Sequence, residues 1–582
     1  MKNINKQTHM SFFRSSLMAF KGLLLISLIG LFLYSCNEDT FLDEEPLDFL
    51  SPTNSFVTIN DFESAVFGLY ANYRTNFWGQ GGASASPRIM FSGTDLVMND
   101  KDLGSSPPDW SALLRPTENR VSQVWVASYE IIFDANVIIS RADQESSTLT
   151  SEQKNLIKGE ASFFRGLAYR MLANMYGGVP VVLEEIDSPR RDFTRASREA
   201  VYEQAASDLS FAVQNLNAIS ATADHRVSKE AANHLLTEVL ISLGNYSEAV
   251  QAASAVINNS DMGLMTERFG TRMNDPNFDG DVYWDLFRRG NQNRSTGNKE
   301  AIWVLQFEHL TEGGGDNELL LERFSIPRLW RANVKNNDGK NQFLVGNGPN
   351  TNYYGRGSGF QRPTPFFLNE IWSRSGDGDI RNSEHNIVRD FIINNPKSEF
   401  DGLMALADNT NLQLRNYADT ARNFYPALAK NSTPGNHPQD LFASNQSIPG
   451  SLTSSGRQTF RDHYSMRLAE TYLLRAEAYL GVGDVAAAAA DINVVRRRSS
   501  APEVMPGEVD IDYILDERLR ELYYEEFRRL TLMRLGKLVE RTRKYNPVFV
   551  GHSIQDHHDL WPVPFGEIEK NVEADLTQNP GY

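Results

Sequence analysis

An aspartate-rich segment is the first candidate for metal chemistry in this sequence. Asp275, Asn277 and Asp279 place oxygen ligands at alternate positions and Gly280 follows them, which is how a calcium-binding loop begins. Such a loop needs a bidentate glutamate at its twelfth position, where this chain has Leu286. An Asx-rich turn is therefore favoured over a calcium site, and no cofactor is expected.

The short signatures of common catalytic sites are missing. The chain has no His-Glu-x-x-His zinc helix, no Gly-x-Ser-x-Gly nucleophile turn, no phosphate-binding loop and no dinucleotide fingerprint. A pair of carboxylates for glycoside hydrolysis has no fixed spacing in a sequence, so a surface glycosidase stays open as an alternative. The motif search therefore assigns no reaction to this protein.

The single cysteine, Cys36, carries the clearest predicted chemistry. It follows a basic leader and an apolar run from Leu23 to Leu33, which is too short to span about 30 Å of hydrocarbon but fits a secretory signal peptide. Leu33 and Ser35 stand at the −3 and −1 positions of a bacterial lipobox. We expect residues 1–35 to be removed and Cys36 to carry the lipid that anchors the protein.

The charge balance of the chain is acidic. There are 57 Lys and Arg against 74 Asp and Glu, for a net charge of −17, which argues against a nucleic-acid partner because phosphate binding needs clustered basic residues. Residues 36–53 begin with an acidic stretch that predicts a solvated tether. In some Gram-negative bacteria such a stretch resembles a signal for export to the outer leaflet, so display towards the cell exterior is compatible with it.

Residues 54–259 have the apolar spacing of amphipathic helices, with Thr150 and Gln153 forming a capping box at the start of one of them. An apolar helix, a glycine and a second helix that opens with small residues occur around Gly244 and again 239 residues later around Gly483. This arrangement resembles tetratricopeptide helical hairpins, although a generic helical hairpin is the simpler alternative. The pattern predicts helices that pack in pairs.

Residues 260–462 are rich in glycine, asparagine and proline, and they predict a loop-rich insertion with one strand at 301–307, where Trp303 belongs to the core. Helical spacing returns at 463–545, and residues 546–582 form an irregular tail. The predicted fold class is mainly α: a tetratricopeptide-like scaffold of helical pairs with a large loop-rich insertion and minor β structure, in one domain over 54–582.

Five segments, in chain order, carry a resemblance to a known family. They are Phe41-Leu42-Asp43-x-x-Pro46 beside the lipobox cysteine, Met175–Pro180, Arg467–Ala478, Arg518-x-x-Glu521-Leu522 with Phe527-Arg528-Arg529, and Trp561–Pro564 with Gln578–Tyr582. Together they resemble the SusD/RagB family of outer-membrane nutrient-binding lipoproteins over essentially the whole mature chain.

The resemblance implies a function as well as a fold. Members of this family display a helical scaffold with long loops at the cell surface, where they act as a lid over a SusC-type TonB-dependent transporter. They bind oligosaccharides, polysaccharides or other nutrients and deliver them for import without catalysis. A SusC-like transporter, a glycan and the outer membrane are therefore the expected partners, and no enzymatic activity is expected.

Sugar recognition needs flat aromatic faces beside polar groups that bond hydroxyls, and two loop regions offer both. The residues that we expect to contact a ligand are Trp78, Arg88, Asp95, Asn99, Asp100 and Trp110 in the first region and Trp330, Tyr353, Tyr354 and Arg356 in the second. Packing beneath its own loop is the alternative for each aromatic side chain. A helical-repeat surface scaffold that binds a protein or peptide is the alternative function.

Overall fold

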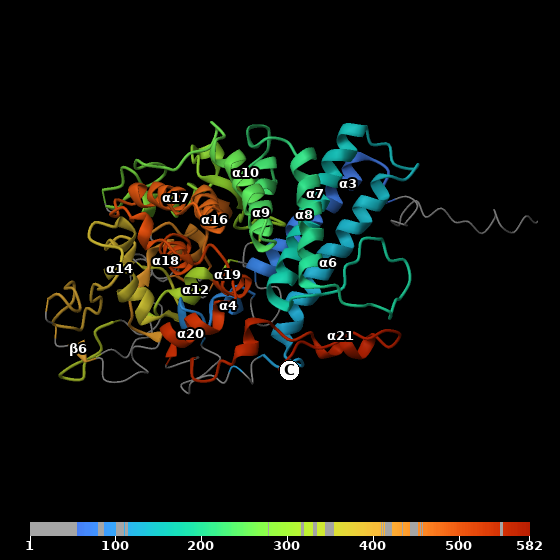
Figure 1. Ribbon diagram of the computed structural model, residues 1–582. Coiled ribbons are helices and arrows are strands. Elements are labelled where there is room, and N and C mark those ends of the chain that lie inside the picture. The colour runs from blue at the N-terminus through green and yellow to red at the C-terminus, as the bar shows by residue number, and fades with distance from the viewer. Residues whose placement is uncertain are drawn as a thin grey trace, which may run out of the picture. The chain divides into compact units, whose positions relative to one another are not determined.

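In the computed structural model, the main helices of the described chain lie within residues 59–257 and 468–545 (Figure 1). The structure describes residues 55–79, 86–100, 110, 114–276, 279–315, 319–329, 335–343, 354–408, 410, 412–413, 422–433, 435–442, 452–453, 455–456, 458–547 and 551–582. The predicted signal peptide, Cys36 and the acidic tether lie outside these residues. Residues 58–582 form one compact unit.

In the sequence, the main helices precede and follow a middle region of short elements. They are α3 (Ile59–Tyr73), α6 (Asn119–Ala142), α7 (Ser151–Tyr176), α8 (Arg198–Asn215), α9 (Lys229–Ser242), α10 (Tyr246–Ile257), α16 (Leu468–Gly481), α17 (Val485–Arg498), α18 (Ile511–Leu522), α19 (Arg528–Arg534) and α20 (Leu538–Tyr545). Shorter helices are α4 (Ser86–Phe91), α11 (Val282–Leu286), α12 (Leu321–Ser325), α14 (Ile371–Ser373) and α21 (Phe565–Lys570). Among the described helices, none combines the length and the apolar character that a membrane crossing demands.

The described strands are short and pair antiparallel in two-stranded sheets. They are β1 (Val97–Asp100) with β4 (Gln361–Pro363), β2 (Ala301–Leu305) with β8 (His463–Arg467), β3 (Lys335–Asn336) with β6 (Leu412–Gln413), and β5 (Ile387–Val388) with β7 (Ala427–Leu428). The strand predicted at 301–307 is present as β2, which ends two residues earlier, at Leu305. Its Trp303 is fully buried among Tyr73, Phe163 and Phe164, as the sequence indicated.

Helix α7 shows how local sequence sets the helix boundaries. The Thr150 hydroxyl accepts a hydrogen bond from the Gln153 amide at 3.2 Å, and the Gln153 side chain accepts one from the Thr150 amide at 3.0 Å. This reciprocal capping box satisfies two amides that the first helical turn leaves without partners. The helix ends at Gly177, as the Gly-Gly-Val-Pro sequence predicted.

The two segments with the repeated glycine spacing form helical pairs that pack on each other. Gly244 and Gly483 turn the chain between α9 and α10 and between α16 and α17 with φ of 76° and 83°, angles that favour glycine. Helix α16 then lies against α10, so closely that a Cβ on Gly481 would come within 2.3 Å of the Tyr246 ring. Figure 1 shows orange α16 and α17 beside green α9 and α10. The predicted fold class of paired helices is confirmed.

The two ends of the scaffold also close on each other through the family motif segments. The Trp561 amide donates to the Met175 carbonyl at 2.7 Å, which joins the C-terminal region to the end of α7. The Asn579 side-chain amide donates to the Tyr176 carbonyl at 2.9 Å and to the Trp561 carbonyl at 2.6 Å. The last residues of the chain are thus tied to the first half of the scaffold.

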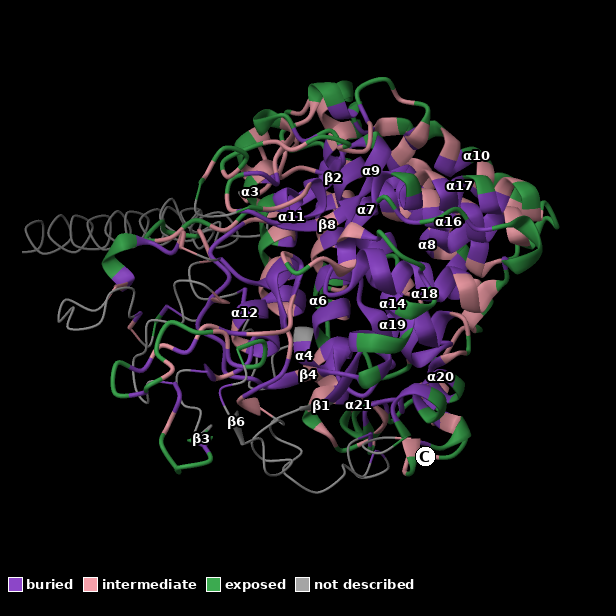
Figure 2. Cartoon of the chain, turned by 90° about the vertical axis from the view of Figure 1, so that its left-hand side faces the viewer, coloured by how far each residue is buried: buried purple, intermediate pink, exposed green. Residues whose placement is uncertain are grey.

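A network of buried charges joins the middle region to the scaffold around α18. Glu521 of α18 accepts from Arg467 of β8 at 2.7 Å, from Arg381 of the middle region at 3.1 Å, and from Arg498 of α17. The side chains of these four residues are at most 1% exposed. Figure 2 shows α16, α18, β2 and β8 mostly in the purple of buried residues.

The carboxylates of Glu517 and Glu521 are held in their charged form. Burial alone would raise the pKa of Glu517, but the guanidinium groups of Arg381, Arg520 and Arg496 lower it to about 2. Glu300 accepts at 2.8 Å from both Arg467 and Arg498. Because each arginine has more than one acceptor, removal of one carboxylate leaves a buried positive charge short of partners.

We predict that Glu521→Ala lowers the free energy of unfolding by about 3–5 kcal/mol, the usual cost of breaking a buried ion pair from one side. Urea denaturation of the purified protein measures this loss. Arg497→Ala is the matched control, because Arg497 lies on α17 between two network arginines but pairs with Glu503 where both side chains are more than half exposed. The control should change the free energy by less than about 0.5 kcal/mol; equal losses in both variants would contradict the prediction.

Candidate ligand-binding loops and a groove on helix α6

The first loop region that the sequence singled out contacts the segment that follows the second loop region. Strand β1 of the first region pairs with β4, which follows the second region directly, with Val97 opposite Pro363 and Asp100 opposite Gln361. The Gln361 side chain donates to the Arg88 carbonyl at 2.9 Å and to the Ser92 hydroxyl at 2.8 Å. Two segments that are about 270 residues apart in the sequence are therefore adjacent in the structure.

Asp95 fixes the first loop region to the C-terminal helices. Its carboxylate accepts from Arg528 of α19 at 2.8 and 2.7 Å and from Arg541 of α20 at 2.7 Å, and the side chain is fully buried. Burial alone would raise the pKa of Asp95, but Arg528 and Arg541 lower it to about 2. Asp95 therefore ties its own segment of the chain to helices α19 and α20.

The two predicted tryptophans of the first region also lie inside the protein. Trp78 is 2% exposed, and its ring packs 4.0 Å from the His463 ring and 4.5 Å from the Phe527 ring, measured between centroids. Trp110 is likewise 2% exposed and lies with the Arg529 guanidinium 4.6 Å from its ring centroid. Both rings are packed inside the protein in this structure.

The described residues of the second region have a similar place. The Tyr354 ring packs edge-on against Phe391 at 4.9 Å, and its hydroxyl accepts from the Ile392 amide at 3.0 Å. Arg356 is buried, and its amide donates to the Glu322 carboxylate at 2.7 Å. Arg88 of the first region packs against the segment that follows Arg356, with its guanidinium 5.3 Å from the Phe360 ring centroid.

The remaining predicted residues lie wholly or partly outside the described part of the chain. Asn99 and Asp100 belong to β1, but their side chains are not among the described groups. Trp330 and Tyr353 lie outside the described residues and directly adjoin Leu329 and Tyr354, which are described. Ligand contact by the ten predicted residues therefore stays a prediction.

Asp281, at the end of the aspartate-rich segment, caps a helix. Asp281 accepts from the Trp284 amide at 2.8 Å and so caps α11, and the side chains of Ser383 and Asn386 donate to the same carboxylate at 2.9 and 2.8 Å. Within the residues that the structure describes, no three His, Cys, Asp or Glu side chains are grouped to hold a metal ion.

A concave surface that the sequence did not indicate lies along α6. It has a volume of about 720 Å³ and is bounded by α6, the 180–193 segment and the C-terminal 567–576 segment. We call this surface the α6 groove, and the lining residues that matter below are Val126, Tyr129, Glu130, Phe133, Asp134, Glu184, Arg190, Glu567 and Lys570. Its volume falls within the range of small-molecule sites.

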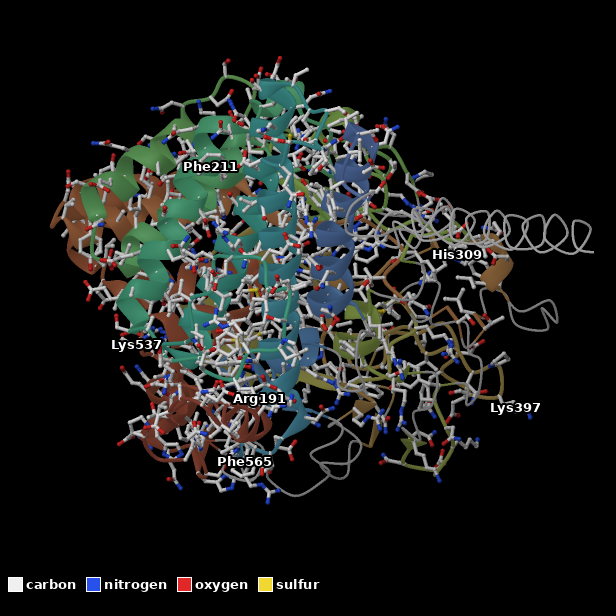
Figure 3. All side chains as sticks on the ribbon, turned by 90° about the vertical axis from the view of Figure 1, so that its right-hand side faces the viewer. Arg191, Phe211, His309, Lys397, Lys537 and Phe565 are labelled. Atoms are coloured by element: carbon white, nitrogen blue, oxygen red, sulfur yellow. The ribbon has the colours of Figure 1, made fainter. Side chains whose placement is uncertain are left out.

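Hydrogen bonds hold the walls of the α6 groove in place. The Tyr129 hydroxyl of α6 donates to the Pro180 carbonyl at 2.7 Å. The Phe193 amide donates to the Asn571 side chain, which donates back to the Phe193 carbonyl, both at 2.8 Å. Figure 3 looks onto this side and labels Arg191 in one wall segment and Phe565 at the start of α21.

One sequence signal could have indicated the α6 groove. Val126, Glu130 and Phe133 follow one another at helical spacing, so they share a face of α6, and the two apolar members are 43% and 46% exposed. Exposed apolar residues on one helix face suggest an unfilled surface. The two segments that complete the walls come from distant parts of the chain, which helical spacing does not reveal.

The chain matches two protein family models. Residues 299–582 match the family model described as the SusD family, and residues 42–241 match the model described as "Starch-binding associating with outer membrane". These two ranges take in most of the chain. The protein belongs to the SusD-like family.

Full-length relatives agree with this assignment. SusD-like protein P25 of Formosa agariphila is 25% identical over 94% of this chain and 97% of its own length. Surface glycan-binding protein A of Bacteroides thetaiotaomicron, solved in complex with laminarihexaose, is 18% identical with a TM-score of 0.65 and covers 90% of this chain and 100% of its own. A laminarin-binding SusD-like protein is 22% identical with a TM-score of 0.61 over the same shares. At these identities the solved structures show a shared fold.

We predict that Asp95→Asn lowers the free energy of unfolding by about 2–3 kcal/mol at pH 7, because two buried arginines lose their carboxylate. The folded-state pKa of Asp95 is lowered to about 2 from 3.8, so the stabilisation is present above pH 4 and is lost as the pH falls through 2. Urea denaturation at several pH values checks this. Asp556→Asn is the control, since Asp556 pairs with Arg543 while its own side chain is 90% exposed; a difference that does not shrink in acid would refute the assignment.

Proposed function

We propose that this protein is a cell-surface lipoprotein that binds oligosaccharide or polysaccharide nutrients and delivers them to a SusC-type TonB-dependent transporter of the outer membrane. The observation that carries the proposal is a SusD-like fold over nine-tenths of the chain, shared with one neighbour solved with laminarihexaose and another that binds laminarin. The description of the matching family as associating with the outer membrane supports the location.

The ligand site in this proposal is the surface above β1 and β4. The pairing of these strands brings the first predicted loop region next to the chain that follows the second. Asn99, Asp100, Trp330, Tyr353 and Tyr354 are the proposed direct contacts, with aromatic faces for sugar rings and polar groups for hydroxyls. The buried side chains Trp78, Arg88, Asp95, Trp110 and Arg356 act through the loops that they support.

The protein acts as a binder in this proposal and leaves its ligand intact. Asp95, a fully buried carboxylate of the predicted site, is held ionised between two arginines with a pKa of about 2. A general acid in glycoside hydrolysis needs a raised pKa and contact with the glycosidic oxygen. The pKa of Asp95 is lowered, which supports a role in loop anchoring rather than as a general acid.

We predict that the purified protein without residues 1–36 binds laminarihexaose, laminarin or starch and leaves the chain length of each unchanged. Isothermal titration calorimetry measures binding, and chromatography of the same samples after prolonged incubation measures cleavage. Shorter products would identify a glycosidase. Absence of binding to every glycan, with recovery of a soluble multi-protein assembly from cell extracts, would favour the protein-binding scaffold instead.

The lipid anchor requires its own experiment. We predict that Cys36→Ser moves the protein from the outer-membrane fraction to the soluble fraction and ends labelling by a fatty-acid analogue, because no other cysteine is available for lipidation. Asn37→Ser is the control that keeps the cysteine, and it should stay membrane-bound. From detergent extracts the control should bring down a transporter barrel; recovery of Cys36→Ser in the membrane with its label intact would contradict the anchor.

A further inference from the structure

The α6 groove offers an aromatic and aliphatic surface to solvent. Phe133 and Val126 of α6 are nearly half exposed, although both line a concave surface where apolar groups are usually covered. Tyr129 lies between them on α6 and is half-buried, with its hydroxyl engaged by the Pro180 carbonyl. A ligand with flat apolar faces would remove this surface from water.

The charges of the groove are unevenly paired. Arg190 is bound to Glu184 at 2.6 Å and to Asp192 at 2.9 Å, and Lys570 is bound to Glu567 at 2.9 Å. The cations that line the groove thus already have carboxylate partners.

Two carboxylates on the α6 wall lack such partners. Glu130 and Asp134 are four residues apart and so share a helix face, and the described residues provide neither of them with an ion pair or a hydrogen bond. Asp134 is half-buried; burial and then the neighbouring Glu130 raise the pKa of Asp134 to about 6. The groove as it stands therefore carries unneutralised negative charge beside exposed aromatic and aliphatic groups.

We propose that the α6 groove is a second ligand site, which binds an oligosaccharide whose sugars carry free ammonium groups. The ammonium of one sugar would lie between Glu130 and Asp134, and the apolar face of a ring would lie on Phe133. An anionic ligand would be repelled, and a neutral one would cover the two carboxylates without neutralising them. The choice of an oligosaccharide as the ligand rests on the proposed function. The requirement that this ligand carry positive charge rests on the groove alone.

A pair of commercial oligosaccharides tests the requirement for charge. The probes are a hexamer of β-1,4-linked glucosamine, which carries ammonium groups, and the hexamer of N-acetylglucosamine, which has the same rings without them. Calorimetry at about pH 6.5 should show binding of the first and at least about tenfold weaker binding of the second.

Substitutions in the α6 groove test whether the glucosamine hexamer binds there. Asp134→Asn and Glu130→Gln preserve side-chain shape, and each should weaken binding of the glucosamine hexamer at least about tenfold, while Phe133→Ala should weaken it through loss of the ring platform. Glu145→Gln is the matched control, because Glu145 is an exposed carboxylate just beyond the end of α6 and does not line the groove. Unchanged melting temperatures would show that the variants fold.

Laminarihexaose in the same assay separates this proposal from the proposed function. If it binds equally to the wild type and the α6 variants while the glucosamine hexamer binds only the wild type, two distinct sites exist. Equal binding of both amino-sugar hexamers, unchanged binding in Asp134→Asn and Glu130→Gln, or no binding of the glucosamine hexamer would each overturn the α6 site. Loss of laminarihexaose binding alone would count against the loop site and leave the α6 site standing.

Discussion

The structure depends on the neutralisation of carboxylates that are buried around α18. Glu517 and Glu521 lie in an interior where an isolated charge would be prohibitively unfavourable, and arginines from β8, α17 and the middle region approach them from several sides. Arginine suits this role because its planar group can donate to two carboxylates at once. Arg381 and Glu300 belong to the loop-rich middle of the chain. The same network of ion pairs therefore also ties this middle region to the helical scaffold.

The segments that carry the family resemblance are largely the segments of this interior. Arg467 and Glu521 are network members, Arg528 holds Asp95, and the Trp561 and Asn579 backbone and side-chain bonds close the C-terminus onto α7. A motif match of this kind therefore reports how the scaffold is held together. It says little about the ligand, because all ten predicted contact residues lie outside the motif segments.

Local rules explain which parts of the structure could be predicted. Helix α7 follows from the Thr150 capping box, and the helical pairs follow from the spacing at Gly244 and Gly483, because caps and tight turns are properties of neighbouring residues. The burial of Trp78 and Trp110 could not be predicted, since loop aromatics face solvent or core according to distant partners such as Phe527 and Arg529. The pairing of β1 with β4 and the walls of the α6 groove join segments that are far apart in the sequence, so neither could be predicted from local patterns.

One electrostatic rule links the interior to the α6 groove. Around α18 each buried carboxylate has arginine partners, and the pKa of Glu517 falls to about 2 as a result. On α6 the half-buried Asp134 has no such partner among the described residues, and its pKa rises to about 6, which above that pH corresponds to a destabilisation of roughly 1 kcal/mol after allowance for solvent screening. A cation bound from solution would supply at the groove what Arg381 and Arg467 supply inside the protein. A positively charged ligand that pairs with Asp134 would relieve this destabilisation, and the free energy released would contribute to its binding.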